Sequence, residues 1–297
     1  MNVGILLGGN SPERDVSLAT GQAMYEAVLA LGYKGIKIEL GSSLSALDSP
    51  LQKVDVVLNA LHGGMGENGI VQGYLDTLGI PYTGSGALSS ALCMDKHFSK
   101  IIVRDAGLRT PDWELLPASA PPAEVSLAVP LVVKPVDQGS TVGLSIVHQV
   151  TELETAWTNA RPYSRRIMME KFIPGREITV AVIDGNPYPV VEIIPSHELY
   201  DYECKYSQGL SNYTCPADLE PTLTQQIQEA AEAIYGALGC RHYGRVDFRL
   251  DGEEYWFLEM NTLPGMTATS LVPKAVKAAG MSFHQLIDTL LTLAMKS

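Results

Sequence analysis

Short apolar runs alternate with longer amphipathic segments over the first third of the chain. This alternation is typical of βαβ units, in which parallel strands form a sheet that helices cover on both faces. We therefore predict an α/β fold with a mostly parallel, doubly wound sheet at the N-terminus. The expected strands span residues 2–7, 35–40, 54–61 and 80–84, and the expected helices span residues 11–32 and 69–79.

The rest of the chain mixes helices with antiparallel strands. A helix is expected over residues 87–106, and the turn-rich stretch "GLRTPDW" marks a boundary after it. Alternating apolar positions over residues 166–195 and 244–261 predict consecutive antiparallel strands and a hairpin. A polar, aromatic stretch over residues 196–220 is long for a loop in a compact domain, and such loops are generally functional or disordered. Further helices are expected over residues 152–162, 221–239 and 282–296.

Composition narrows the class of protein. A length of 297 residues suits two or three domains, and 46% hydrophobic with 18% charged residues is typical of globular proteins. The net charge of −12 argues against a nucleic-acid partner and means that an anionic ligand must be met by clustered cations. No apolar run is long enough to predict a membrane span, and the N-terminus lacks the basic region of a signal peptide. The four cysteines form no CxxC pair, so a reducing cytoplasm is the simplest location.

Polar side chains interrupt the otherwise apolar hairpin near the C-terminus. Asp247 lies in its first strand, and Glu259 and Asn261 lie in its second. Converging oxygen-bearing side chains are the ligands that Mg²⁺ prefers, and a buried carboxylate without a partner is costly. These residues share one face only if the turn around Asp251-Gly252 has an odd number of residues, because side chains alternate along each strand. The alternative is a salt-bridged strand pair, with Arg245 against Glu259.

The stretch "VVKPVDQGSTVG" predicts a phosphate-binding loop. Lys134 lies on the strand before the loop, and Ser140 and Thr141 add hydroxyl groups to a backbone that glycine keeps free to surround a phosphate. The loop lacks the Walker pattern, and "GGNSPE" lacks the spacing of a dinucleotide-binding turn, so neither a P-loop nor an NAD site is indicated. The alternative is an ordinary hairpin turn.

Two further pairs of residues are candidates. Glu170 and Glu177 flank an apolar stretch around Ile173, which would suit a nucleobase in an apolar slot and a ribose on a carboxylate. Glu13 and His62 follow predicted parallel strands, and the carboxyl ends of such strands are where α/β sheets bind ligands. The alternatives are solvated charges for the first pair, and a helix-dipole contact and a structural histidine for the second.

Taken in order, the motifs of the chain resemble those of the D-alanine–D-alanine ligases of the ATP-grasp superfamily. The resemblance rests on "GGNSPERDVSL", "HGGMGENG", "YTGSG", "MDKHFSK", "VVKPVDQGSTVG", "YDYECKY", "GRVDF" and "LEMNTLPGMTATSLVP". It covers essentially the whole length and implies an ATP-grasp architecture of three α/β domains. These would be an N-terminal domain over residues 1–86, a central domain with a glycine-rich lid over residues 87–182, and a metal-binding domain over residues 183–297. The resemblance also implies a cytoplasmic homodimer that uses ATP and two Mg²⁺ or Mn²⁺ ions to join two D-alanines for peptidoglycan synthesis.

The same resemblance implies roles for individual residues. The nucleotide would be bound by Lys96, Lys134, Glu170, Lys171, Ile173, Glu177 and Lys205, and the metal ions by Asp247, Glu259 and Asn261. The first D-alanine would contact Glu13 and His62, and the site would be closed by Ser140 and Tyr206. The oxyanion hole would consist of Arg245 and the N–H of Gly265, and the second D-alanine would contact Ser270 and Leu271.

Three other functions stay open. One is a related ligase that takes D-lactate as second substrate, although Lys205-Tyr206 resembles the dipeptide-forming version. The second is an amino-acid ligase of broader specificity, and the third is a non-catalytic ATP-binding protein. The chain also departs from the family pattern at Asn68, at Asp137-Gln138 and at Thr141, and the stretch from Asp247 to Glu259 is one residue shorter than usual.

Overall fold

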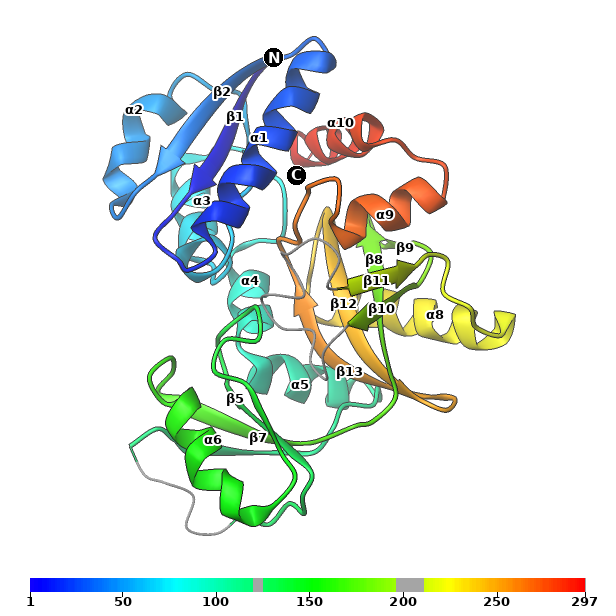
Figure 1. The fold of residues 1–297 in the computed structure, drawn as a ribbon. Helices are drawn as coiled ribbons and strands as arrows, with labels where there is room; N and C mark the ends of the chain where they lie inside the picture. The colour runs from blue at the N-terminus through cyan, green and yellow to red at the C-terminus, as the bar shows by residue number, and fades with distance from the viewer. Residues whose placement is uncertain (120–124, 196–210, 297) are drawn as a thin grey trace.

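A computed structural model describes residues 1–119, 125–195 and 211–296. Its strands form one three-stranded, one four-stranded and one six-stranded sheet, with helices packed against them (Figure 1). The α/β class predicted from the alternation is confirmed. In the described part of the chain, no helix combines the length and the apolar character needed to cross a membrane.

The first sheet is parallel, as the N-terminal alternation predicted. Its elements are β1 (Asn2–Gly8), α1 (Arg14–Ala30), β2 (Lys34–Leu40), α2 (Asp48–Leu51), β3 (Val56–Asn59) and α3 (Ile70–Leu78). The strand order is β2-β1-β3, and both pairings are parallel. Ile5 packs into the core beneath α1, whereas the adjacent Leu6 packs into the core beneath α3, so both faces of the sheet are buried.

The predicted strand over residues 80–84 is reduced to a single bridge from Tyr82 to Val57. Two hydrogen bonds with Val57 hold this segment beside β3. Pro81 has no N–H to extend the ladder, and Gly84 turns the chain with a φ of +98°.

The predicted helix over residues 87–106 is divided into α4 (Ala87–Met94) and α5 (Lys96–Asp105). Asp95 adopts an extended backbone between them, and its carboxylate accepts hydrogen bonds from the backbone N–H groups of His97 and Phe98. An aspartate in this capping position begins a new helix, which is why the uninterrupted helix was wrong. The break brings Lys96 to the first turn of α5, where its side chain enters a cavity.

The second sheet is antiparallel, with strand order β4-β7-β5-β6. Its elements are β4 (Trp113–Pro117), β5 (Leu131–Pro135), β6 (Ser145–Val147), α6 (Leu153–Ala160) and β7 (Arg166–Lys171). Helix α6 covers one face through the buried side chain of Trp157. The glycine loop that connects β5 to β6 leaves this sheet on the side of the third sheet.

The third sheet is also antiparallel and has the order β11-β10-β8-β12-β13, with β9 paired to β8. Its strands are β8 (Arg176–Ile183), β9 (Asn186–Pro187), β10 (Val191–Pro195), β11 (Ser211–Thr214), β12 (Tyr243–Asp251) and β13 (Glu254–Asn261). The helices of this part are α8 (Pro221–Ala237), α9 (Leu271–Ala278) and α10 (Phe283–Ala294). Helix α8 covers one face of the sheet, and α9 covers the other.

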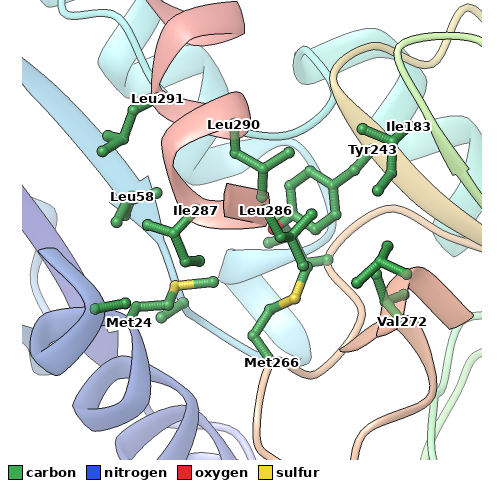
Figure 2. Packing of buried hydrophobic residues seen from close by; sticks show 14 of the residues in the cluster. Met24, Leu58, Ile183, Tyr243, Met266, Val272, Leu286, Ile287, Leu290 and Leu291 are labelled. Carbon is green, nitrogen blue, oxygen red and sulfur yellow. The ribbon is translucent and has the colours of Figure 1, made fainter. Parts of the chain in front are cut away.

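The C-terminal helix α10 joins the first and third sheets through one continuous core (Figure 2). Its Leu286 and Ile287 are fully buried between Met24 of α1 and the buried Tyr243 of β12. Burying two large aliphatic side chains stabilises such an arrangement by about 3–6 kcal/mol. The core therefore fixes the beginning of α1, which Glu13 directly precedes, relative to the hairpin of β12 and β13.

Candidate active site

Two neighbouring cavities lie between the sheets and share one wall. The first cavity lies between β5 and β7 on one side and β12 and β13 on the other, and the second lies between the beginnings of α1 and α9. Gly139 and Ser140 of the glycine loop line both of them. A ligand in the first cavity and a ligand in the second would therefore meet at this loop.

Almost every residue predicted for the site lines one of these cavities. The first cavity is lined by Lys96, Lys134, Glu170, Lys171, Ile173, Glu177, Asp247 and Glu259. The second is lined by Glu13, His62, Arg245, Asn261, Gly265, Ser270 and Leu271. Ser140 lines both, and Lys205 and Tyr206 lie outside the described residues.

A buried glutamate lies between two lysines at the inner end of the first cavity. Glu170, only 2% exposed, has its Oε2 2.7 Å from Lys134 Nζ and its Oε1 2.5 Å from Lys100 Nζ. Burial alone would raise the pKa of Glu170, but the two ammonium groups outweigh it and lower that pKa. Lys100 was missed in the sequence, although it follows Lys96 by four residues in "MDKHFSK" and so lies on the same helical face.

The outer part of the same cavity contains an apolar stretch held by an arginine. Arg249 donates from Nε to the backbone oxygen of Ile173 at 3.3 Å, and its Nη1 lies 3.6 Å from Glu177 Oε2. Both residues of the "IPGRE" stretch are thus fixed to β12. With Lys96, Lys134 and Arg249 along one cavity, the clustered positive charge that an anionic ligand requires is present despite the net charge of −12.

The hairpin contradicts the predicted turn length but retains the predicted face. Its turn is two residues long, since Asp251 pairs directly with Glu254. A β-bulge at Leu258 then shifts the register by one residue, so that Asp247 lies opposite Glu259. An odd-numbered turn was therefore a wrong requirement, because an extra residue within a strand restores the same face. The bulge also directs Leu258 and Glu259 into the same cavity.

Asp247 is held by three neighbours. Arg245 donates to both of its carboxylate oxygens at 2.9 and 2.8 Å, and Asn261 Nδ2 donates to Oδ2 at 2.9 Å. Thr179, its fully buried partner on β8, donates from Oγ1 to Oδ1 at 2.6 Å. Arg245 therefore forms an ion pair with Asp247, and Glu259 Oε2 lies 3.0 Å from Lys96 Nζ.

The donor set at the end of the hairpin suits a hard divalent cation. Asp247 and Glu259 offer carboxylate oxygens from directly opposed positions, and Asn261 offers an amide oxygen two residues further on. Burial lowers the pKa of Lys96 and Glu259 raises it, and the net shift is upward. Lys96 is therefore positively charged beside the Glu259 carboxylate. Two carboxylates with a flanking ammonium group are compatible with a metal ion and an anionic ligand bound side by side.

The second cavity has an ionic wall built by Glu13 and the glycine loop. Ser140 Oγ donates a hydrogen bond to Glu13 Oε1. Ser140 and Thr141 both have positive φ values, +50° and +63°, in a region that side chains other than glycine rarely adopt. Strain of this kind persists where the surrounding structure fixes the loop, and it is concentrated at binding sites.

His62 lies at the base of the second cavity with contacts on both ring nitrogens. Its Nε2 is 3.1 Å from Thr20 Oγ1, and its Nδ1 is 3.5 Å from Glu67 Oε1. These contacts orient the imidazole, which is 6% exposed. Thr20 and Glu67 were missed in the sequence, because only the packing of α1 against the loop after β3 brings them to this ring.

The beginning of α9 forms the opposite side of the second cavity. Ser270 precedes its first turn, and Ser270 Oγ accepts a hydrogen bond from the N–H of Thr267 at 3.0 Å. A Cβ on Gly265 would lie 2.9 Å from Ser270 Oγ, so a side chain there would displace this hydroxyl group. The N-terminus of an α-helix carries partial positive charge, and this end of the cavity therefore suits a carboxylate.

Comparisons with known proteins agree with this geometry. The family model described as "D-ala D-ala ligase C-terminus" matches residues 102–292, and the one described as "D-ala D-ala ligase N-terminus" matches residues 38–85. A D-alanine–D-alanine ligase of Syntrophotalea carbinolica is 42% identical over 97% of this chain and 94% of its own. The crystal structure of such a ligase from Bacillus anthracis covers 100% of this chain and 98% of its own, with 37% identity and a TM-score of 0.90. A structure of the Bacillus anthracis ligase complexed with ATP covers the same shares, with 34% identity and a TM-score of 0.87. The chain belongs to the D-alanine–D-alanine ligase family.

Proposed function

We propose that the protein joins two molecules of D-alanine to D-alanyl-D-alanine, with ATP in the first cavity and both D-alanines in the second. The observation that carries this proposal is the wall of Gly139 and Ser140 that the two cavities share. It would bring a carboxylate bound near Glu13 next to the terminal phosphate of a nucleotide bound along Lys134 and Lys96. An energy-coupled ligation needs this adjacency, since positioning supplies much of the acceleration.

The reaction proceeds in two steps. A carboxylate oxygen of the first D-alanine attacks the γ-phosphorus, the bond to the β-phosphate oxygen breaks, and ADP leaves. The product is an acyl phosphate. The neutral amine of the second D-alanine then attacks the acyl carbon, the bond to the phosphate oxygen breaks, and phosphate leaves with one oxygen of the original carboxylate. The nitrogen gives up one proton as the amide forms.

The residues of the chain would serve these steps through charge and position. Glu13, fixed by Ser140, would bind the ammonium group of the first D-alanine, and the beginning of α9 would bind the carboxylate of the second. Arg245 and the N–H of Gly265 would stabilise the tetrahedral oxyanion, an effect of about 3–4 kcal/mol per donor in comparable sites. Lys96 and Lys134 would neutralise the phosphates.

The metal site belongs to the same proposal. Asp247, Glu259 and Asn261 would hold two Mg²⁺ or Mn²⁺ ions, which would neutralise charge on the transferring phosphoryl group. Lys96 would then exchange its contact with Glu259 for one with phosphate. Burial lowers and Glu259 raises the pKa of Lys96, with a net upward shift, so the lysine is charged when the nucleotide arrives.

The test follows one oxygen atom. D-Alanine labelled with ¹⁸O in its carboxylate is incubated with Mg·ATP, and the phosphate and the peptide product are examined by mass spectrometry. The proposal predicts dipeptide formation with ¹⁸O in the released phosphate, and no phosphate release with L-alanine. An ester product formed in the presence of D-lactate would show that D-lactate serves as the second substrate. Release of unlabelled phosphate would refute the acyl-phosphate intermediate.

We also propose a cytoplasmic homodimer, on the basis of the family alone. Light scattering after size-exclusion chromatography measures the mass in solution against 32.1 kDa for one chain. A monomer at working concentration would refute the dimer, and recovery of the protein with the membrane fraction would refute the location.

A further inference from the structure

Lys100 is completely buried behind the first cavity and does not line it. Its side chain is 0% exposed, and its ammonium group lies 2.5 Å from Glu170 Oε1. The same ammonium donates to Thr110 Oγ1, which in turn donates to the backbone oxygen of Phe257 at 2.9 Å. The Trp113 ring lies over it at 5.3 Å. A charge buried this completely is normally retained only with a partner, and its partner here is Glu170.

Glu170 therefore has two counter-ions of different kinds. Lys134 approaches from β5, lines the cavity and can reach a ligand there. Lys100 approaches from α5, on the side away from the cavity. The three side chains carry one more positive charge than negative, which is unexpected for a buried cluster unless an anion joins it.

A nucleotide in the cavity would compete for Lys134. If Lys134 were the sole partner of Glu170, its movement toward a phosphate would leave a buried, unpaired carboxylate, which is costly. The carboxylate would then protonate or move, and it would lose the orientation needed to meet the edge of a base. A second counter-ion behind it removes this conflict.

We propose that Lys100 is a positioning residue for ATP: it is the permanent counter-ion of Glu170 and leaves Lys134 available to the nucleotide. The inference rests on the proposed function, because it concerns the same cavity, but it is tested through nucleotide binding rather than ligation.

The titration of Lys100 supports this assignment. Burial is the largest effect on the pKa of Lys100; Glu170 opposes it, and Lys134 and Arg104 add to it, so that the pKa is lowered to about 8. Its ammonium also contacts the Thr110 hydroxyl and the Trp113 ring, neither of which is ionic. Lys100 thus loses its charge as the pH rises through about 8, and ADP affinity should weaken over the same range.

The experiment measures the Kd of Mg·ADP by calorimetry between pH 6.5 and 9.5, together with KM for ATP and kcat. Lys100→Met should raise the Kd at pH 7 by about 5- to 150-fold, the usual size of coupling between two sites. It should also abolish the pH dependence near 8, with kcat changed far less than KM for ATP. Lys100→Arg, which keeps a charge that does not titrate, should bind like the wild type at pH 7 and also lack the pH dependence.

A thermodynamic cycle separates positioning from general damage. In a Glu170→Gln background, Lys100→Met should have little further effect on Kd, because the charge that Lys100 compensates is gone. Equal effects in both backgrounds, or a Lys100→Arg protein that keeps the wild-type pH dependence, would overturn the inference. Should Lys100→Met fail to fold, the Lys100→Arg pH profile decides alone. Normal ADP binding without any dipeptide would refute the proposed function but leave this inference open to the same tests.

Discussion

The hydroxyl of Thr179 is expected to stabilise the protein chiefly by fixing Asp247. It lies 2.6 Å from Asp247 Oδ1 and 3.0 Å from the oxygen of Val246, but its single proton favours the charged acceptor. Thr179→Val replaces the hydroxyl with a methyl group of similar volume, so the packing is nearly unchanged. A hydrogen bond to a charged group contributes about 1.5–3 kcal/mol, and we expect the free energy of unfolding to fall by about that amount.

Unfolding in urea, followed by circular dichroism, measures this change, and the thermal midpoint should fall by about 2–4 °C per kcal/mol, or slightly less for a chain of this length. The Mg²⁺ concentration that half-activates the enzyme should rise, since Asp247 loses one of the groups that orient it. Thr179→Ser is the matched control, because it keeps the hydroxyl and should retain the wild-type Mg²⁺ dependence. A valine variant within about 0.5 kcal/mol of wild type, which is the ordinary range of neutral substitutions, would refute the reasoning.

Three other predictions concern pH, backbone and substrate. Burial, followed by the neighbouring Arg241, lowers the pKa of His242 to about 4, so the folded protein binds this proton less readily than the unfolded chain. The stability that comes from the neutral imidazole is complete above pH 6.5, and up to about 3 kcal/mol of it is lost as the pH falls toward 4. His242→Asn, which tolerates the φ of +61° at this position, should weaken the dependence of the free energy of unfolding on pH, as measured by urea titrations. An unchanged pH dependence in this variant would contradict the prediction. Gly175→Ala would place a Cβ 2.2 Å from a backbone oxygen at a residue with a φ of +94°. Gly185 also has a positive φ, +77°, but a Cβ there would meet no atom within 4 Å, so Gly175→Ala should lower the thermal midpoint far more than Gly185→Ala. Equal decreases in the two variants would refute the role of the contact. Ser140→Ala removes the hydrogen-bond donor to Glu13. Because a hydrogen bond to a charged group is lost, kcat/KM for D-alanine should fall by about 10- to 100-fold. A decrease of less than about threefold, with an unchanged thermal midpoint, would show that this hydrogen bond does not position Glu13 for the substrate.

Local patterns predicted much of this architecture. The parallel first sheet followed from apolar runs such as residues 2–7, because burial on both faces leaves no polar alternation. The sequence also contained an indication of the helix break at Asp95, since aspartate is a favoured N-cap residue. A single helix was predicted instead, because the helical pattern continues across this residue. Some of the residues that line the two cavities, such as Lys134, Glu170 and Asp247, were candidates from local patterns. Others, such as Lys96 and Gly265, came only from the resemblance to a family, and the individual roles of all of them stay predictions.

The missed residues share a physical cause. Lys100 and Thr179 act through partners that are distant in sequence, on strands whose register no local pattern specifies. Alternation alone also gave a wrong rule for the hairpin, since a bulge at Leu258 is invisible in hydropathy. Such long-range pairings arise only when the sheets assemble.

That bulge makes the functional end of the hairpin independent of the length of its tip. An insertion in the two-residue turn would leave Glu259 opposite Asp247 as long as Asp251 still pairs with Glu254, so relatives should tolerate differences in length there. If the bulge were straightened at constant length, Leu258 would instead lie opposite Asp247, and Glu259 would face the other side of the sheet. An alignment of relatives should therefore place differences in length in the turn and keep the two carboxylates matched.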